Sequence, residues 1–172
     1  MASAAAATAA SAFTRSAAAA ANKHRNVVLY VVDDLGLDEA GCYGNPVVHT
    51  PALDELAATG TRFDYGFCTT ASCSASRSAI LTGRHNHATG QYGHTHGYNH
   101  FSAFDHVVSL PARLREAGYR TISAGKYHVA PQDVFPFDQF IQHEFRGHES
   151  PEQMARACES VFAENSDAPF FL

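Results

Sequence analysis

The sequence predicts an α/β fold in which helices cover a central, largely parallel β-sheet. Residues 26–32 are a continuous run of apolar and β-branched side chains, typical of a strand that is covered on both faces. Further along the chain, segments of helical periodicity alternate with short strand-like segments. The chain has 172 residues, of which 45% are hydrophobic and 17% charged, which is enough for one domain with a sizeable core.

Local signals set the limits of the other elements. A helix begins at Pro51, since proline is favoured at the first helical position, and ends at Gly60. Leu53, Leu56 and Ala57 form its apolar stripe. The remaining expected elements are an extended segment at 61–67, helices at 74–81, 110–117 and 151–162, and a strand at 120–124.

The two ends of the chain differ from its middle. Residues 1–22 are almost wholly Ala, Ser and Thr and resemble a signal-peptide remnant, so we expect one domain at 23–172 in a secreted, periplasmic or lysosomal protein. Residues 170–172 begin a further buried strand. We therefore expect a sheet that is incomplete at the C-terminus, a chain that is the N-terminal part of a longer protein, and no activity from the 172 residues alone.

Charge and cysteine content exclude several classes of protein. The net charge of -5 provides no basic surface for nucleic acid, and no apolar run reaches the ~20 residues of a membrane span. The four cysteines include no Cys-x-x-Cys pair, so we expect neither a disulfide scaffold nor a zinc finger. A few local cations must therefore bind any anionic substrate.

Asp33 and Asp34 directly follow the first expected strand. Ligands of α/β proteins bind at the carboxyl ends of strands, and a turn at Leu35-Gly36 allows both carboxylates to face one site. Adjacent carboxylates repel each other unless a cation neutralises them, and oxygen ligands suit Ca²⁺ or Mg²⁺. The alternative is a solvated turn.

Two further pairs have the spacing of a catalytic site. Cys73 and Arg77 are four residues apart at the start of a helix, hence on one face, and a helix N-terminus favours an anion. Lys126 and His128 are two apart after the strand at 120–124 and project to one side if the segment is extended. Taken singly, each pair has an alternative: packing for the cysteine and a surface position for the Lys–His pair.

The sequence motifs around these residues resemble those of the sulfatase family, the formylglycine-dependent branch of the alkaline-phosphatase-like superfamily. Cys-Ser-Ala-Ser-Arg at 73–77 with Leu-Thr-Gly-Arg at 81–84 is similar to its cysteine motif, and Gly-Lys-Tyr-His at 125–128 to its lysine–histidine motif. The resemblance implies an alkaline-phosphatase-like sandwich and a cysteine that a formylglycine-generating enzyme oxidises to formylglycine beside Ca²⁺. It implies catalytic roles for Cys73, Arg77, Lys126 and His128, and metal binding by Asp33, Asp34 and Cys73.

The strings at 99–105, 126–131 and 134–138 resemble the heparan N-sulfatase branch of that family. This resemblance implies hydrolysis of the sulfamate of N-sulfated glucosamine, with a sulfated saccharide as substrate. The alternatives are an aryl or other carbohydrate sulfatase, a phosphonate or phosphate monoester hydrolase on the same framework, and an inactive truncated product. The sequence is also compatible with a homodimer.

Histidines are concentrated in one stretch of the chain, and a His-x-His…His-x-His pattern is typical of transition-metal binding. No Cys or carboxylate lies within the run. We therefore expect one or two of these histidines, with His100 as the candidate, to line the substrate pocket and the rest to be loop residues; a metal-binding module is the alternative. The run comprises His85, His87, His94, His96 and His100.

Overall fold

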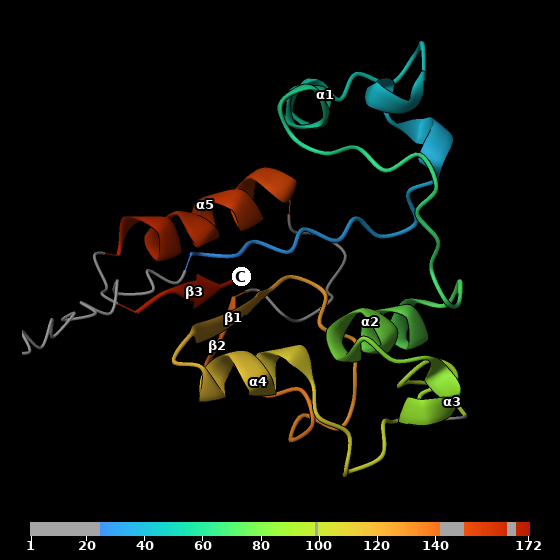
Figure 1. Ribbon diagram of the computed structural model, residues 1–172, viewed down its shortest axis with the longest axis vertical. Coiled ribbons are helices and arrows are strands. Elements are labelled where there is room, and N and C mark those ends of the chain that lie inside the picture. The colour runs from blue at the N-terminus through green and yellow to red at the C-terminus, as the bar shows by residue number, and fades with distance from the viewer. Residues whose placement is uncertain (1–24, 99, 142–149, 165–167) are drawn as a thin grey trace, which may run out of the picture.

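The computed structural model describes residues 25–98, 100–141, 150–164 and 168–172. Within these residues, three parallel strands form a sheet in the order β2-β1-β3 (Figure 1). The predicted α/β class with a parallel sheet is confirmed. The strands are β1 (Arg120–Ala124), β2 (Gln139–Ile141) and β3 (Phe170–Phe171), and the register pairs Ile122 with Gln139 and Arg120 with Phe170.

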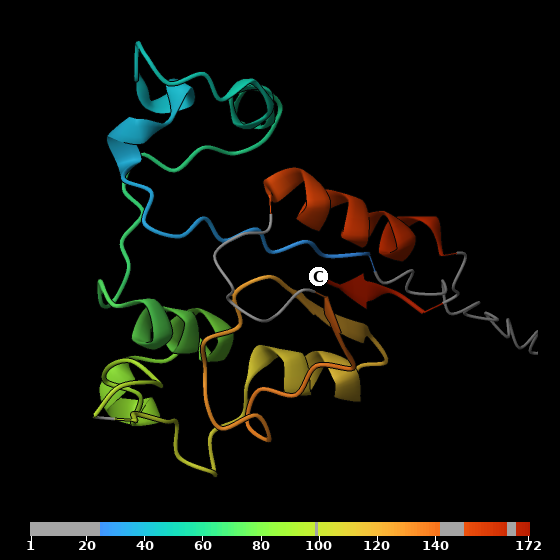
Figure 2. The ribbon, with the colours of Figure 1, turned by 180° about the vertical axis from the view of Figure 1, so that it is seen from behind.

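Helices lie on both sides of this sheet, as the two opposite views in Figures 1 and 2 show. On one side is α5 (Pro151–Ala163), whose Cys158 and Val161 pack against Ile122 of β1. On the other side is α4 (Leu110–Glu116). A second core cluster lies in the segments that flank α4 and follow β1, and it consists of Ala103, Val107, Val129, Val134 and Phe135.

Local signals determine where the helices begin and end. The helix α1 (Pro51–Thr59) has proline at its start and Gly60 at its end, and α2 (Cys73–Thr82) ends before Gly83, whose φ is 63°. The expected helices and the strand at 120–124 are confirmed to within two residues. The sequence did not predict α3 (Asn86–Thr89), the 3₁₀ helices η1 (Leu37–Glu39) and η2 (Gly41–Tyr43), or β2.

The strand predicted at 26–32 is wrong in both extent and burial. Val27 forms one parallel bridge to Phe171, and the Leu29 N–H donates to the Leu172 carbonyl at 2.7 Å. The apolar side chains of 27–32 are 37% to 75% exposed. The reason is that β3, the strand beside this segment, has two residues. Within the described residues, the segment therefore has no longer strand to pair with and is not covered on both faces.

Residues 37–67 stand apart from the sheet (Figure 1). No residue of α1 is fully buried: Leu56 of its apolar stripe is 66% exposed, whereas Leu53 and Ala57 are half-buried, so the described residues cover the stripe only in part. The segment 61–67, expected to be extended, is an irregular exposed loop. The leader predicted at 1–22 lies outside the described residues, and among the described helices none has the length and apolar character to cross a membrane.

Candidate active site

Two aspartates and a cysteine from distant parts of the chain meet in the structure. The ligand atoms of Asp33, Asp34 and Cys73 all lie within 4.8 Å of one another. The aspartates form the turn after the extended segment beside β3, and Asp34 has a φ of 55°, a left-handed conformation that Asp tolerates. Cys73 is the first residue of α2, where helix N–H groups favour an anion. The aspartate pair and the cysteine motif therefore form one cluster.

Arg77 and Lys126 neutralise Asp33. Lys126 Nζ lies 2.6 Å from Asp33 Oδ2, and Arg77 Nη2 lies 3.2 Å from Asp33 Oδ1. The hydrogen bond from Lys126, with a smaller contribution from Arg77, holds the pKa of Asp33 below its usual value even though partial burial opposes this. Arg77 also donates to the Lys126 carbonyl at 2.9 Å, which joins α2 to the end of β1.

The donor set at this cluster fits a hard divalent cation. Two carboxylates within 4.8 Å of each other provide the oxygen ligands that Ca²⁺ prefers. The sulfur of Cys73 is a soft ligand, and a formylglycine at this position would present oxygen in its place. Asp33, Asp34 and residue 73 are thus the residues that would hold such an ion.

Lys126 and His128 leave the sheet through a turn. Gly125 follows β1 with a φ of 73°, a left-handed conformation that favours glycine. His128 also has a positive φ, 51°. The segment is therefore not the extended continuation of β1 that the spacing suggested, and Lys126 meets Asp33 while His128 meets His96.

His128 lies in surroundings that keep its imidazole neutral. Partial burial, followed by the positive charge of Lys126 and the neighbouring His96, His94 and Arg77, lowers the pKa of His128 to about 4. Its Nδ1 is buried without a hydrogen-bond partner among the described residues. At neutral pH the ring therefore retains a lone pair that can accept a proton or a metal ion.

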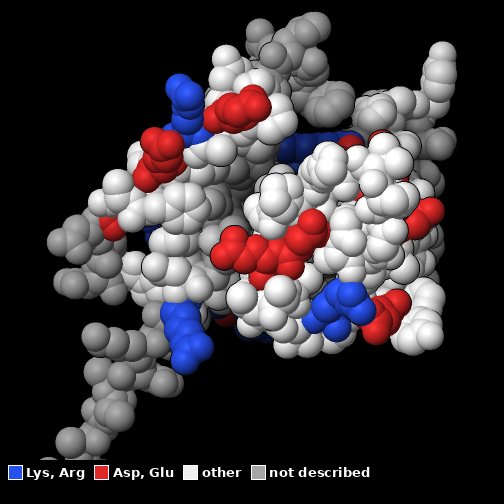
Figure 3. Space-filling model, turned by 90° about the horizontal axis from the view of Figure 1, so that it is seen from above, with Lys and Arg blue, Asp and Glu red and all other residues white. Residues whose placement is uncertain are grey.

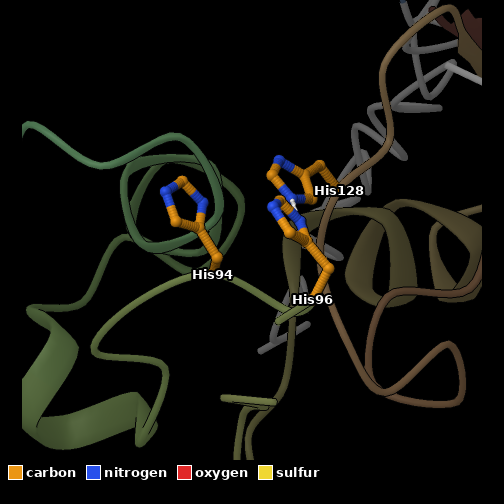
Figure 4. Close-up of side chains that lie close together, drawn as sticks. All are labelled: His94, His96 and His128. Atoms are coloured by element: carbon orange, nitrogen blue, oxygen red, sulfur yellow. Dashed lines mark hydrogen bonds between the residues drawn. The ribbon is translucent and has the colours of Figure 1, made fainter. Parts of the chain in front are cut away.

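Two residues of the histidine run reach this site, and neither is His100. His94, His96 and His128 have ligand nitrogens within 4.8 Å of one another (Figure 4). His100 is exposed, has a φ of 40° and belongs to neither group of ligand atoms; its role in substrate binding stays a prediction. The His-Thr-His alternation at 94–96 was the available signal, but the third imidazole comes from a turn 32 residues away.

Charged side chains are dispersed over the visible face of the molecule. In Figure 3, Lys and Arg are separated by acidic and uncharged residues rather than joined in one basic patch on that face. The two cations near Cys73 are instead shielded, because the side chains of Arg77 and Lys126 are 13% and 18% exposed. At the candidate site, Arg77 and Lys126 are thus the cations available to an anion.

The sheet is parallel, charged residues follow β1, and a cysteine begins α2. The chain thus forms an α/β domain of the alkaline-phosphatase-like type. The chain belongs to the sulfatase family, whose model matches residues 25–171. It is 46% identical to human N-sulphoglucosamine sulphohydrolase over 114 residues, which are 66% of this chain and 22% of that protein. It is 39% identical to human arylsulfatase A over 127 residues, which are 71% of this chain and 25% of that protein.

Solved structures share the fold of this chain. A protein described in complex with its substrate D-glucosamine-2-N,6-O-disulfate shares the fold with a TM-score of 0.66 and 24% identity, over 87% of this chain and 33% of that one. A protein of glycosaminoglycan metabolism in Bacteroides thetaiotaomicron has a TM-score of 0.62 and 28% identity, over 70% and 29%. The chain thus spans about a fifth to a third of the length of the relatives it matches.

Proposed function

We propose that the protein to which this chain belongs hydrolyses the sulfamate of N-sulfated glucosamine residues in heparan-type glycans. The observation that carries the proposal is the meeting of Cys73 with Asp33 and Asp34, beside the cations Arg77 and Lys126. The 46% identity to N-sulphoglucosamine sulphohydrolase supports the substrate class. A second candidate, a sulfate ester, is supported by the 39% identity to arylsulfatase A.

Residue 73 and the two aspartates carry the first part of the chemistry. Cys73 is the residue that formylglycine would replace, and in its hydrated form that group supplies an oxygen nucleophile. Asp33 and Asp34 would hold Ca²⁺, whose chemistry when bound is to place positive charge beside the sulfate oxygens. The N-terminus of α2 adds the partial positive charge of its free N–H groups at the same position.

Lys126 and Arg77 carry the second part, which is to bind the anionic group. In this structure they compensate the charge of Asp33 at 2.6 and 3.2 Å. If Asp33 and Asp34 held a divalent cation, that ion would neutralise Asp33, and Lys126 and Arg77 could donate hydrogen bonds to a sulfate group instead. Their low exposure strengthens those bonds, because water competes less for the donors.

His128 carries the proton transfer. The imidazole is neutral at neutral pH, since its pKa is lowered to about 4, and in this form, although a weak base, it can accept a proton from the nucleophile's hydroxyl at the stage where sulfate leaves. The residue adopts a positive φ, and its Nε2 contacts Nδ1 of His96 at 2.7 Å.

Turnover by the product of the complete gene, made in a cell with the formylglycine-generating enzyme, tests this proposal. N-sulfoglucosamine, glucosamine 6-sulfate, an aryl sulfate and an aryl phosphate are compared at equal concentration. We expect the highest kcat/KM for the sulfamate. A preference for either sulfate ester would replace the substrate class within the family, and a preference for the phosphate would overturn the sulfatase activity itself.

A further inference from the structure

Three imidazoles converge next to the aspartate cluster. His94 and His96 belong to the loop after α3, and His128 faces them from the turn after β1 (Figure 4). The nearest nitrogens, Nδ1 of His96 and Nε2 of His128, are 2.7 Å apart, and the ring centroids of the three pairs are separated by 4.8 to 5.4 Å. His128 is 32 residues away from His96 in the sequence, so the fold of the chain brings the rings together.

The backbone on the side of His94 and His96 is fixed by contacts outside the rings. The Thr95 N–H donates to Ser74 Oγ of α2 at 3.2 Å, and the Phe101 N–H donates to the His94 carbonyl at 3.0 Å. A Cβ at Gly93 would lie 2.7 Å from the Phe101 ring, so the loop packs against itself as closely as glycine permits. The backbone of the two histidines is therefore held in place before any ligand binds, while their exposed imidazoles can turn.

The His128 side is fixed as well. The adjoining Val129 is 5% exposed and belongs to the core cluster, and the Ala103 N–H donates to the Ala130 carbonyl at 2.7 Å. His128 adopts a φ of 51°, which is rare for a residue other than glycine and is a conformation that surrounding structure must maintain. Both segments that supply imidazoles are thus anchored, one to α2 and the other to the core.

We propose that His94, His96 and His128 form a binding site for a divalent transition metal such as Zn²⁺, separate from the oxygen site at Asp33 and Asp34. Imidazole nitrogen is a preferred ligand of Zn²⁺ and its neighbours in the first transition series, whereas Ca²⁺ takes oxygen. Zinc–nitrogen bonds of about 2.0–2.1 Å place tetrahedral ligands about 3.3 Å apart. The three rings are nearly parallel, with interplanar angles of 14° to 24°, so the exposed rings of His94 and His96 must turn toward the partly buried His128 to bring the nitrogens to this spacing.

The surrounding charge does not by itself attract a cation. Lys126 and Arg77 place positive charge near His128, and Asp33, with one negative charge, offsets it only in part. A metal ion here must therefore be bound by the imidazole nitrogens themselves, which are preferred ligands of Zn²⁺. Three protein ligands leave one tetrahedral position for water. If the proposed function holds, metal bound here engages the imidazole needed for proton transfer, so Zn²⁺ would act as a reversible inhibitor.

Zn²⁺ binding by the full chain tests the proposal without reference to turnover. The titration is made against a chromophoric zinc chelator in the Cys73→Ala background, where the thiol of the neighbouring cluster cannot bind the metal. We expect one Zn²⁺ per chain, not displaced by excess Ca²⁺, and a Co²⁺ complex with the visible absorption of a tetrahedral site. Far-UV circular dichroism of each variant checks that it is folded, and His94 and His96 are exposed, so their removal leaves the core intact.

His94→Ala/His96→Ala should weaken Zn²⁺ binding at least about tenfold. Removal of a residue that only hydrogen-bonds to a metal ligand already lowers metal affinity by that factor. The matched control is His85→Ala/His87→Ala, which removes two rings of the same run that lie 5.7 Å apart and outside the cluster. An equal loss in both double variants, or no loss in the first, overturns the site. Displacement of Zn²⁺ by Ca²⁺ overturns it too, since the metal would then lie at the carboxylates.

Discussion

The segment 25–67 and the body formed by 73–141 differ sharply in how they are packed, although the candidate active site draws residues from both. Within 25–67, which the structure describes throughout, Ala40 is the one buried residue. The body contains Phe135 and Ile122, both 0% exposed, and most of the two core clusters.

The site joins the two regions. Asp33 and Asp34 come from the open segment, while Cys73, Arg77 and Lys126 come from the body. The ion pairs of Asp33 with Arg77 and Lys126 link the two regions directly, as does the hydrogen bond from the Tyr119 hydroxyl to the Arg25 carbonyl at 3.1 Å. Chemistry that needs both regions therefore depends on residues from one region with a buried core and from another with almost none.

The largest effect is expected on the body side, at the proposed nucleophile. Cys73→Ala in the complete gene product should reduce turnover by roughly 10³-fold or more, since no other group can replace a nucleophile. Folding should be unaffected, because Cys73 is only partly buried at a helix start. Cys68→Ala, which removes an exposed cysteine outside the cluster, is the control. An unmodified thiol at Cys73 in an active preparation, seen by mass spectrometry, would contradict this role.

Two aromatic truncations measure the packing difference directly. Phe135→Ala should lower the free energy of unfolding of this chain by about 3–5 kcal/mol, because a fully buried ring leaves a cavity. Tyr30→Ala, in a side chain that is 75% exposed, should change it by less than about 0.5 kcal/mol. Urea unfolding gives both values. Equal losses would show that the open segment is packed as tightly as the body.

Removing the aspartate that joins the regions should have a smaller effect, on metal binding. Asp33→Asn eliminates a charged oxygen ligand and leaves Lys126 and Arg77 without their carboxylate. The affinity for Ca²⁺ should therefore fall by at least about tenfold. A calcium titration of the complete gene product measures this change. Activity lost in excess chelator should return with Ca²⁺ rather than with Zn²⁺.

The control for this change is Asp64→Asn, which breaks the exposed ion pair with Arg62 in the same segment. Because its two side chains are 45% and 62% exposed, that pair contributes little. If the two variants bind Ca²⁺ alike, Asp33 is not a ligand and the turn is only structural.

The smallest effect concerns cysteine reactivity. Burial raises the pKa of the Cys158 thiol, which packs in α5 against the sheet, so less of it is thiolate at a given pH. Cys68 is exposed in the loop before α2. Alkylation at mildly alkaline pH, followed by peptide mapping, should therefore label Cys68 several-fold faster than Cys158. A faster reaction at Cys158 would mean that α5 detaches from the sheet.

Several elements could be predicted because their signals are local. Pro51 and Gly60 bound α1, Gly83 ends α2, and the limits of β1 match the prediction. The strand at 26–32 failed for the opposite reason: an apolar run indicates burial only if neighbours cover it, and β3 supplies two residues. The strand β2 was missed because three residues carry no periodicity of their own.

The sequence by itself determined the class of fold, the family resemblance and the residues Asp33, Asp34, Cys73, Arg77, Lys126 and His128 as candidates, because helix caps and short motifs depend on neighbours a few residues away. Tertiary structure alone decided that Asp33 pairs with Lys126 across 93 residues of chain and that His128 joins two imidazoles of the histidine run. Such contacts arise from loop closure and packing between remote segments. The spacing of residues along one segment does not encode the distance between that segment and another.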